Sequence, residues 1–167
     1  MAKKIRYTVR ALLFNSAGEV LLFKYRNDPN IHNVGKPPMN SDYWGTVGGG
    51  MEDGESEEAA IRREIAEETG HQNITLGPLV WHRKVDLVFY GDLLHVDEKY
   101  FIAHTPQTDI SIAGHTQIER KFVAETRWWT ASAIEETDEK IFPAVLPQHI
   151  RALAAGTYPQ DILQIDV

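Results

Sequence analysis

The sequence contains no cysteine, which excludes disulfide bonds, thiolate catalysis and cysteine-based zinc sites and fits a reducing compartment. It also lacks any run approaching the roughly 18 apolar residues that a membrane-spanning helix needs. The basic start of the chain, with Lys3, Lys4 and Arg6, precedes an apolar stretch of only Ala11 to Phe14, which is too short for a signal-peptide core. We therefore expect a cytoplasmic protein with no membrane partner.

The sequence is also poor in positive charge: it has 17 lysine and arginine residues against 24 acidic ones, and its net charge is −7. A protein that binds duplex nucleic acid needs a broad basic surface, so we expect no nucleic acid duplex as a partner. The acidic residues are dense between Glu52 and Glu68. Such density indicates either a solvated helix face or a cation site, and the spacing of the carboxylates has to decide.

The chain has 167 residues, 43% of them hydrophobic, which predicts a single domain over residues 1–167 with a substantial core. Apolar, β-branched and aromatic runs predict strands at Ile5 to Phe14, Val20 to Tyr25, Trp44 to Val47, Leu79 to Val85, Asp86 to Tyr90, Glu98 to His104 and Lys121 to Thr130. Capping and propensity predict helices at Ser56 to Thr69, Ala131 to Thr137 and Pro143 to Ala155, with Pro143 in a first turn. This mixture indicates an α/β or α+β sandwich, while the strand order stays open.

A long polar loop is expected from Arg26 to Asp42, where prolines and glycine interrupt regular structure. Loops of this length in compact domains are usually functional. We expect this one to belong to substrate recognition rather than to the core.

Three glutamates of the first predicted helix share one face. Glu64, Glu67 and Glu68 are three and four residues apart, so their side chains project together and repel one another. A hard divalent cation would explain the crowding, because Mg²⁺ prefers oxygen ligands and leaves coordination positions for water and substrate phosphate. For an isolated glutamate-rich helix, a solvated face would be the better interpretation.

The surrounding pattern favours the cation site. Eight positions have fixed separations: Gly49, then Glu55 after five residues, Arg63-Glu64-Ile65 after seven more, and then Glu67-Glu68 and Gly70, each after one residue. This segment resembles the Nudix box. The one departure is His71, where the Nudix family normally has an aliphatic residue, and this change concerns local packing rather than metal binding.

The resemblance implies the α/β/α sandwich of Nudix hydrolases, with a mixed β-sheet. It also implies hydrolysis of a phosphoanhydride bond in a small nucleotide-derived substrate, a nucleoside diphosphate linked to another moiety. The cofactor would be Mg²⁺, with Mn²⁺ as the alternative. Metal ligands are then expected from Gly49, Glu64, Glu67 and Glu68, while Arg63 orients the box carboxylates with Glu55 as its partner.

The general base is not fixed by the motif. Glu64 and Glu67 are candidates within the box, and the resemblance suggests a further glutamate ahead of the late strand, where the chain offers Glu119 and Glu125. We favour Glu119, because the polar region from Thr105 to Arg120 indicates a loop able to move toward the box. Glu125 lies inside a predicted strand and is expected to be solvated or salt-bridged.

Substrate contacts are less determined. Arg26, Trp44 and Arg83 could stack on a base or pair with phosphate, although packing or solvation would equally explain each. Of Trp128 and Trp129, strand alternation predicts that one is buried in the core.

Two other functions are alternatives for a chain with this motif. A non-catalytic Nudix module that binds nucleotides as a regulator is the main alternative, but it would be favoured by lost box carboxylates, and none is lost. A related prenyl diphosphate isomerase would need a reactive cysteine. The identity of the substrate and the oligomeric state stay open, with a homodimer as one alternative.

Overall fold

The computed structural model describes residues 4–166. Within them the chain forms β1 (Ile5–Phe14), β2 (Val20–Tyr25), β3 (Ile31–Asn33), β4 (Tyr43–Gly50), α1 (Glu57–Thr69), β5 (Thr75–Phe89), β6 (Asp92–His104), α2 (Gln117–Phe122), β7 (Val123–Trp129), α3 (Ala131–Glu136), α4 (Leu146–Ala154) and β8 (Leu163–Gln164). None of the helices in this part of the chain is long and apolar enough to cross a bilayer.

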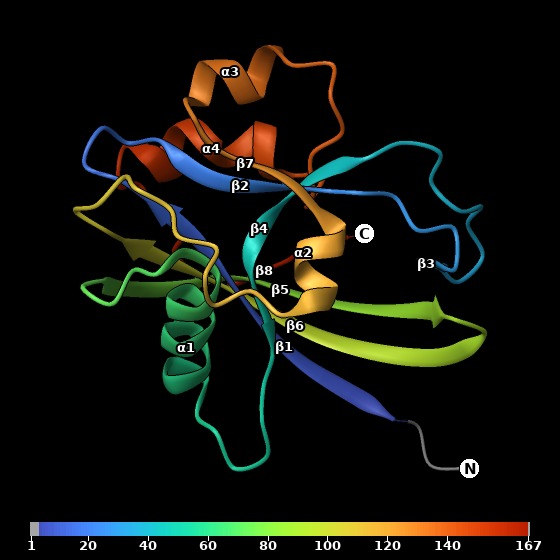
Figure 1. Cartoon of the computed structure of the whole chain (residues 1–167). Helices are drawn as coiled ribbons and strands as arrows, with labels where there is room; N and C mark the ends of the chain where they lie inside the picture. Colours follow the sequence, from blue (N-terminus) through green and yellow to red (C-terminus); the bar gives the residue numbers. More distant parts are fainter. Residues whose placement is uncertain (1–3, 167) are drawn as a thin grey trace.

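All the strands belong to one curled, mixed sheet (Figure 1). Its order is β3-β5-β6-β1-β4-β2-β7, and β8 lies beside β5. β1 runs parallel to β6 along its whole length, from Ile5 opposite His95 to Phe14 opposite His104, and antiparallel to β4. The α/β class and the mixed sheet expected from the sequence are confirmed.

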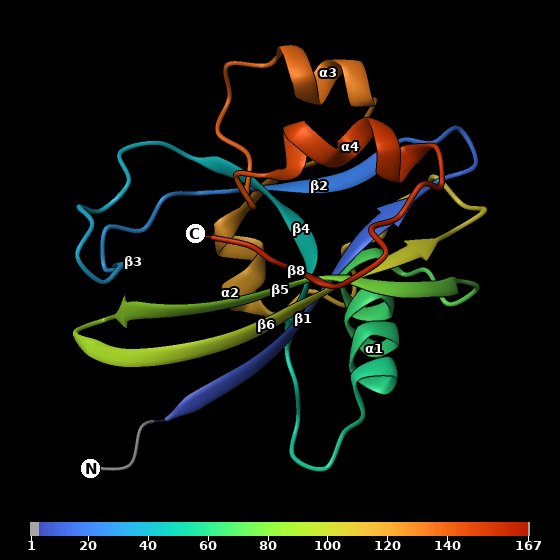
Figure 2. The same cartoon turned by 180° about the vertical axis from the view of Figure 1, so that it is seen from behind.

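Strand alternation gives the sheet two buried faces. On β1, Leu12 and Phe14 join one core cluster, while Val9, Ala11 and Leu13 join the other. The first cluster lies under α3 and α4, and the second lies against α1. Figures 1 and 2 show α1 on one side of the sheet and the α3–α4 pair on the opposite side. The sandwich therefore follows from strands that are apolar on both faces.

Helix α1 begins and ends as the sequence predicts. The Ser56 side chain accepts a hydrogen bond from the Ala59 N–H at 3.1 Å and caps the start. Gly70 ends the helix in the left-handed conformation, with φ of 78°. Ala60, Ile61 and Ile65 are buried against the sheet, and Glu64 and Glu68 are buried on the same side of the helix, where they face the glycine run at the end of β4.

Several expected boundaries were wrong. The two strands expected between Leu79 and Tyr90 are one strand, β5, in which Asp86 pairs with His95 and shifts in register occur between Leu76 and Trp81. The long Arg26 to Asp42 loop contains the short strand β3, which pairs with β5. Such pairings depend on a partner strand far away in the sequence, which local patterns do not reveal.

Two helix expectations also needed correction. The Thr105 to Arg120 region is not loop throughout, because α2 begins at Gln117 and has its own side-chain cap at Thr116. Pro143 is not in the first turn of the last helix. It follows Phe142 in a cis peptide, and α4 starts at Leu146 with Pro147 in its first turn.

Candidate functional site

The glycine run at the end of β4 brings backbone against the carboxylates of α1. Gly48 has φ of 141°, and a Cβ atom there would lie 2.1 Å from the Val9 carbonyl oxygen, so only glycine fits. The Gly48 N–H donates to Oε2 of Glu68 at 2.9 Å. The strand end is thus tied directly to a box carboxylate.

Two of the box carboxylates are buried beneath this loop. Glu64 and Glu68 are only 8% and 7% exposed. A Cβ atom on Gly49 would lie 2.7 Å from Oε1 of Glu64, so the backbone approaches that carboxylate as closely as glycine allows. Burial raises the pKa of Glu64, and it raises the pKa of Glu68 to about 8 despite the positive charge of Arg10.

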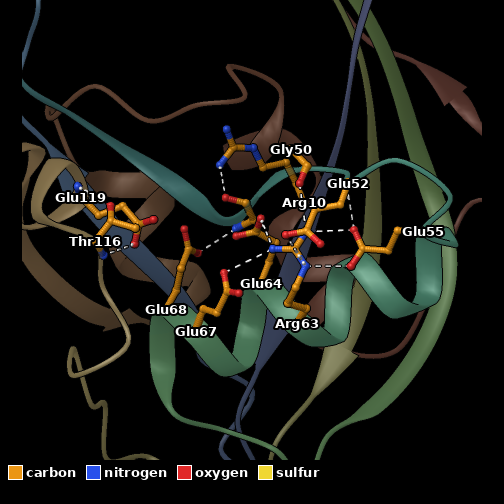
Figure 3. Close-up of polar contacts among 11 residues, drawn as sticks. Arg10, Gly50, Glu52, Glu55, Arg63, Glu64, Glu67, Glu68, Thr116 and Glu119 are labelled. Atoms are coloured by element: carbon orange, nitrogen blue, oxygen red, sulfur yellow. Dashed lines mark hydrogen bonds and ion pairs between the residues drawn. The ribbon is translucent and has the colours of Figure 1, made fainter.

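Arg63 organises the outer carboxylates (Figure 3). Its guanidinium donates to Glu55 at 2.7 and 2.9 Å, to Glu64 at 3.0 Å and to Glu67 at 3.2 Å. It also donates to the Gly50 carbonyl at 3.0 Å. The hydrogen bonds from Arg63 lower the pKa of Glu55 to about 2. The predicted pairing of Arg63 with Glu55 is confirmed, and it holds α1 and the glycine loop together.

The donor chemistry of this site fits a hard divalent cation. Glu64 and Glu68 present buried oxygen atoms, and burial raises the pKa of both carboxyl groups, so a cation bound beside them would stabilise their charged forms. Within residues 4–166, however, no three acidic or histidine side chains already stand as a metal-binding group. Arg63 bonds both Glu64 and Glu67, so a bound cation would require these contacts to loosen. The side chain of Glu67 is 45% exposed, so it has room to turn toward a cation once its contact with Arg63 is released.

Glu119 faces the box from α2. It sits in a capping box, where its N–H donates to the Thr116 hydroxyl at 3.1 Å and its carboxylate accepts from the Thr116 N–H at 3.4 Å. Its negative charge contributes to the raised pKa of Glu68, and Figure 3 shows it on the side of Glu68 away from Arg63. Glu125 instead bonds Arg127 on the exposed strand β7 at 2.8 Å, as the sequence predicts.

Two histidines dock the chain before α2 onto the end of α1. His71, which replaces the usual aliphatic residue of the box, is 2% exposed and bonds the Asp109 carbonyl and the Thr105 hydroxyl at 2.5 and 3.0 Å. His115 bonds the Glu68 carbonyl at 2.7 Å. These contacts position α2, and with it Glu119, beside Glu68.

The structure contradicts the predicted substrate contact of Trp44 and shows the hydrogen-bond partners of Arg26. Trp44 is fully buried, donates to Glu139 at 2.7 Å and packs edge-on against Trp129, so it belongs to the core rather than to a substrate surface. Arg26 is exposed, but its guanidinium donates to the carbonyls of Lys121 and Val123 at 2.8 and 3.4 Å. These hydrogen bonds connect Arg26 to the junction of α2 and β7, and its contact with substrate stays a prediction.

Arg83 belongs to a buried ionic cluster that the sequence did not reveal. Glu98 is 2% exposed and pairs with Arg83 at 2.5 Å and Arg10 at 2.9 Å. Burial would raise the pKa of Glu98, but the two arginines outweigh it and hold the value at about 2. Arg10 also donates to the carbonyls of Thr46 and Gly48, which links the cluster to the glycine loop. A charged residue inside the apolar run of β1 was the signal for it.

The loop of residues 26–42 lines a surface hollow at the edge of the sheet. The hollow has a volume of about 750 Å³ and is lined by Asn33, Val34, Lys36, Lys84, Val85, Asp86 and Asp166. Because β3 joins this loop to β5, the loop is held in place at that edge. Its role in substrate recognition stays a prediction.

Residues 4–148 match the NUDIX domain family. Solved structures with a similar fold include a MutT protein from Methanosarcina mazei Go1, with 21% identity, a TM-score of 0.63 and coverage of 93% of this chain and 97% of that one. The E. coli dihydroneopterin triphosphate pyrophosphohydrolase has 18% identity and a TM-score of 0.60, and the match covers 92% of this chain and 99% of that one. An ADP-ribose pyrophosphatase from Streptococcus suis 89-1591 has 10% identity and a TM-score of 0.56, and the match covers 95% of this chain and 96% of that one. No curated protein matches the sequence.

Proposed function

The chain belongs to the NUDIX domain family and is a Nudix pyrophosphohydrolase, and from this premise we propose that it hydrolyses nucleoside diphosphates linked to another moiety. The cofactor we propose is Mg²⁺, with Mn²⁺ as the alternative. The observation that carries the proposal is the pair of buried carboxylates, Glu64 and Glu68, held against the glycine run of β4. Such an environment favours a divalent cation and a phosphate group together.

Each box residue has a proposed part in the reaction. Glu64, Glu67 and Glu68, with the Gly49 carbonyl, would hold the cation. Arg63 orients Glu55 and Glu64 and joins α1 to the Gly50 carbonyl. When bound, the cation supplies Lewis acidity that stabilises the charge developing on the phosphate oxygens.

Glu119 is the proposed general base. Water attacks one phosphorus atom, a new P–O bond forms, the anhydride P–O bond breaks and the proton of the water passes to the carboxylate. Glu119 lies in the first turn of the short helix α2, where its carboxylate accepts a hydrogen bond from the Thr116 N–H. No residue of α2 is buried, so the Glu119 side chain can turn toward the box without disturbing the core. Glu64 and Glu67 are the alternatives within the box.

A release assay for phosphate-containing products tests the function. The purified chain is incubated with ADP-ribose, sugar nucleotides, dinucleoside polyphosphates and oxidised or ordinary nucleoside triphosphates, in Mg²⁺, Mn²⁺ or EDTA. We expect hydrolysis of at least one diphosphate-linked compound that EDTA abolishes. Tight binding of a nucleotide without turnover of any compound would favour the regulatory module instead, which the intact set of box carboxylates disfavours.

The base assignment predicts different outcomes for two neighbouring glutamates. Glu119→Gln keeps its place in α2 but cannot accept a proton, so kcat should fall about a hundredfold or more. Glu125→Gln is the matched control, because Glu125 only pairs with the exposed Arg127. Both are measured at saturating substrate and Mg²⁺. A large loss confined to Glu125→Gln would reverse the assignment, and no loss in either variant would place the base inside the box.

A further inference from the structure

Three arginines and one buried glutamate share a face of the sheet beside the Nudix box. Arg6 and Arg10 occupy alternate positions of β1, so their side chains leave the strand on the same side. Across the sheet, Thr8 of β1 is opposite Glu98 of β6, and Glu98 is opposite Arg83 of β5. The face therefore carries more positive than negative charge.

The single glutamate is already shared by two of the arginines. Glu98 bonds Arg10 and Arg83, while the Tyr100 and Thr8 hydroxyls donate to its oxygens at 2.8 and 3.2 Å. Arg6 is left outside this arrangement. Its side chain is exposed, and within residues 4–166 its guanidinium makes neither a hydrogen bond nor an ion pair.

Arg6 nevertheless lies at the box. A Cβ atom on Gly50 would be 3.3 Å from its Nε and 3.4 Å from its Nη2, so the guanidinium rests against the third glycine of the loop. The carbonyl of that same glycine accepts from Arg63 at 3.0 Å. Although Arg6 is exposed as a residue, partial desolvation of its guanidinium and repulsion from Arg10 lower its pKa, and the attraction of Glu64 and Glu98 offsets them only in part.

An anion bound near Gly50 would stabilise the positive charge of Arg6. It would provide the acceptor that Arg6 lacks and would screen the repulsion between Arg6 and Arg10. A phosphate group is well suited, because the planar guanidinium can donate two parallel hydrogen bonds to its non-bridging oxygens. The cation proposed among Glu64, Glu67 and Glu68 would bring the substrate's phosphates to this neighbourhood.

We propose that Arg6 is a substrate-binding residue that donates hydrogen bonds to the diphosphate of the substrate beside the Nudix box. The identity of the ligand rests on the proposed function. Arg10 and Arg83 are fixed by Glu98 and supply a constant positive field, whereas Arg6 makes the direct contact. The contact holds the diphosphate before and during the reaction, so it affects KM more than kcat.

Calorimetric titration with methylenediphosphonate tests the contact. This compound has two phosphonates joined by carbon and cannot be hydrolysed, so binding is measured on the full chain in Mg²⁺ without turnover. Arg6→Ala should weaken its binding about tenfold or more, as expected for loss of a charge-assisted pair. Arg6→Lys, which keeps the charge but loses the planar fork, should lie between Arg6→Ala and the wild type.

Arg151→Ala is the control, because Arg151 is an exposed arginine of α4 whose guanidinium pairs with Glu135 of α3 and not with a residue of the Nudix box. It should bind like the wild type, and all variants should unfold at similar temperatures. The proposal is overturned if Arg6→Ala binds as the wild type does, or if the wild type fails to bind the diphosphonate. Should Arg6→Ala lose binding while the wild type hydrolyses no nucleotide, the anion contact stands and the proposed reaction fails.

Discussion

Replacing Glu68 with glutamine is expected to remove most turnover while the fold survives. Glutamine keeps the size of the side chain and an oxygen that can accept from the Gly48 N–H, but it lacks the charge that a divalent cation needs. The loss of kcat should exceed the roughly 10- to 100-fold typical of residues that only orient a metal ligand. Turnover near the wild-type rate at saturating Mg²⁺ would contradict the ligand assignment.

Glu68→Gln is also expected to change how the stability of the metal-free protein depends on pH. Burial raises the pKa of Glu68 from 4.5 to about 8, so between these values the folded protein binds more protons than the unfolded chain. Stability of the metal-free protein should therefore fall as pH rises from about 5 to 8, and Glu68→Gln should remove this fall. Thermal unfolding in EDTA at about pH 5 and pH 9 measures it. The variant should equal the wild type at the lower pH and be more stable than the wild type at the higher.

Glu98→Gln is expected to cause the largest loss of stability. Its carboxylate is 2% exposed and is shared by Arg10 and Arg83, so the change leaves two arginine charges without their counter-ion. Breaking a buried pair in this way costs about 3 to 5 kcal/mol. Urea unfolding at neutral pH should show a lower midpoint with a similar slope.

Glu125→Gln provides the matched comparison, since Glu125 pairs with Arg127 at an exposed position where ion pairs contribute about 0 to 1 kcal/mol. The pH dependence adds a second test. Glu98 has its pKa lowered to about 2, so its contribution is present above about pH 5 and is lost as pH falls toward 2. Glu98→Gln should lack this acid-dependent loss. Equal destabilisation by the two variants would show that the buried cluster does not stabilise the fold.

Much of the candidate site could be predicted from the sequence because its determinants are local. Ser56 and Gly70 mark the ends of α1, and the spacing of Glu64, Glu67 and Glu68 places them on one side of it. The Arg63 to Glu55 pairing also lies within a short stretch of chain. Helix geometry alone relates such residues, so their arrangement needs no knowledge of the rest of the fold.

Other expectations failed where distant contacts decide the outcome. Trp44 has the residue type of a base-stacking side chain, but its place under α3 and α4 buries it completely. Glu119 was expected on a loop, whereas the histidine contacts that dock its segment on α1 leave it at the start of a helix. Residue type indicates what a side chain is able to do, and tertiary packing determines whether it can reach a ligand.

The sequence by itself determined the two-faced strands, the capped helix and its acidic box. Only the tertiary structure decided which strands are neighbours, and therefore that Thr8 of β1 stands opposite Glu98, 90 residues later, and that Arg83 joins them. Strand alternation fixes the face on which a residue lies but not the strand beside it. The order and register of these strands come from burying two apolar faces at once, and that packing brings Arg10 and Glu98 under the glycine loop with Arg6 at its edge.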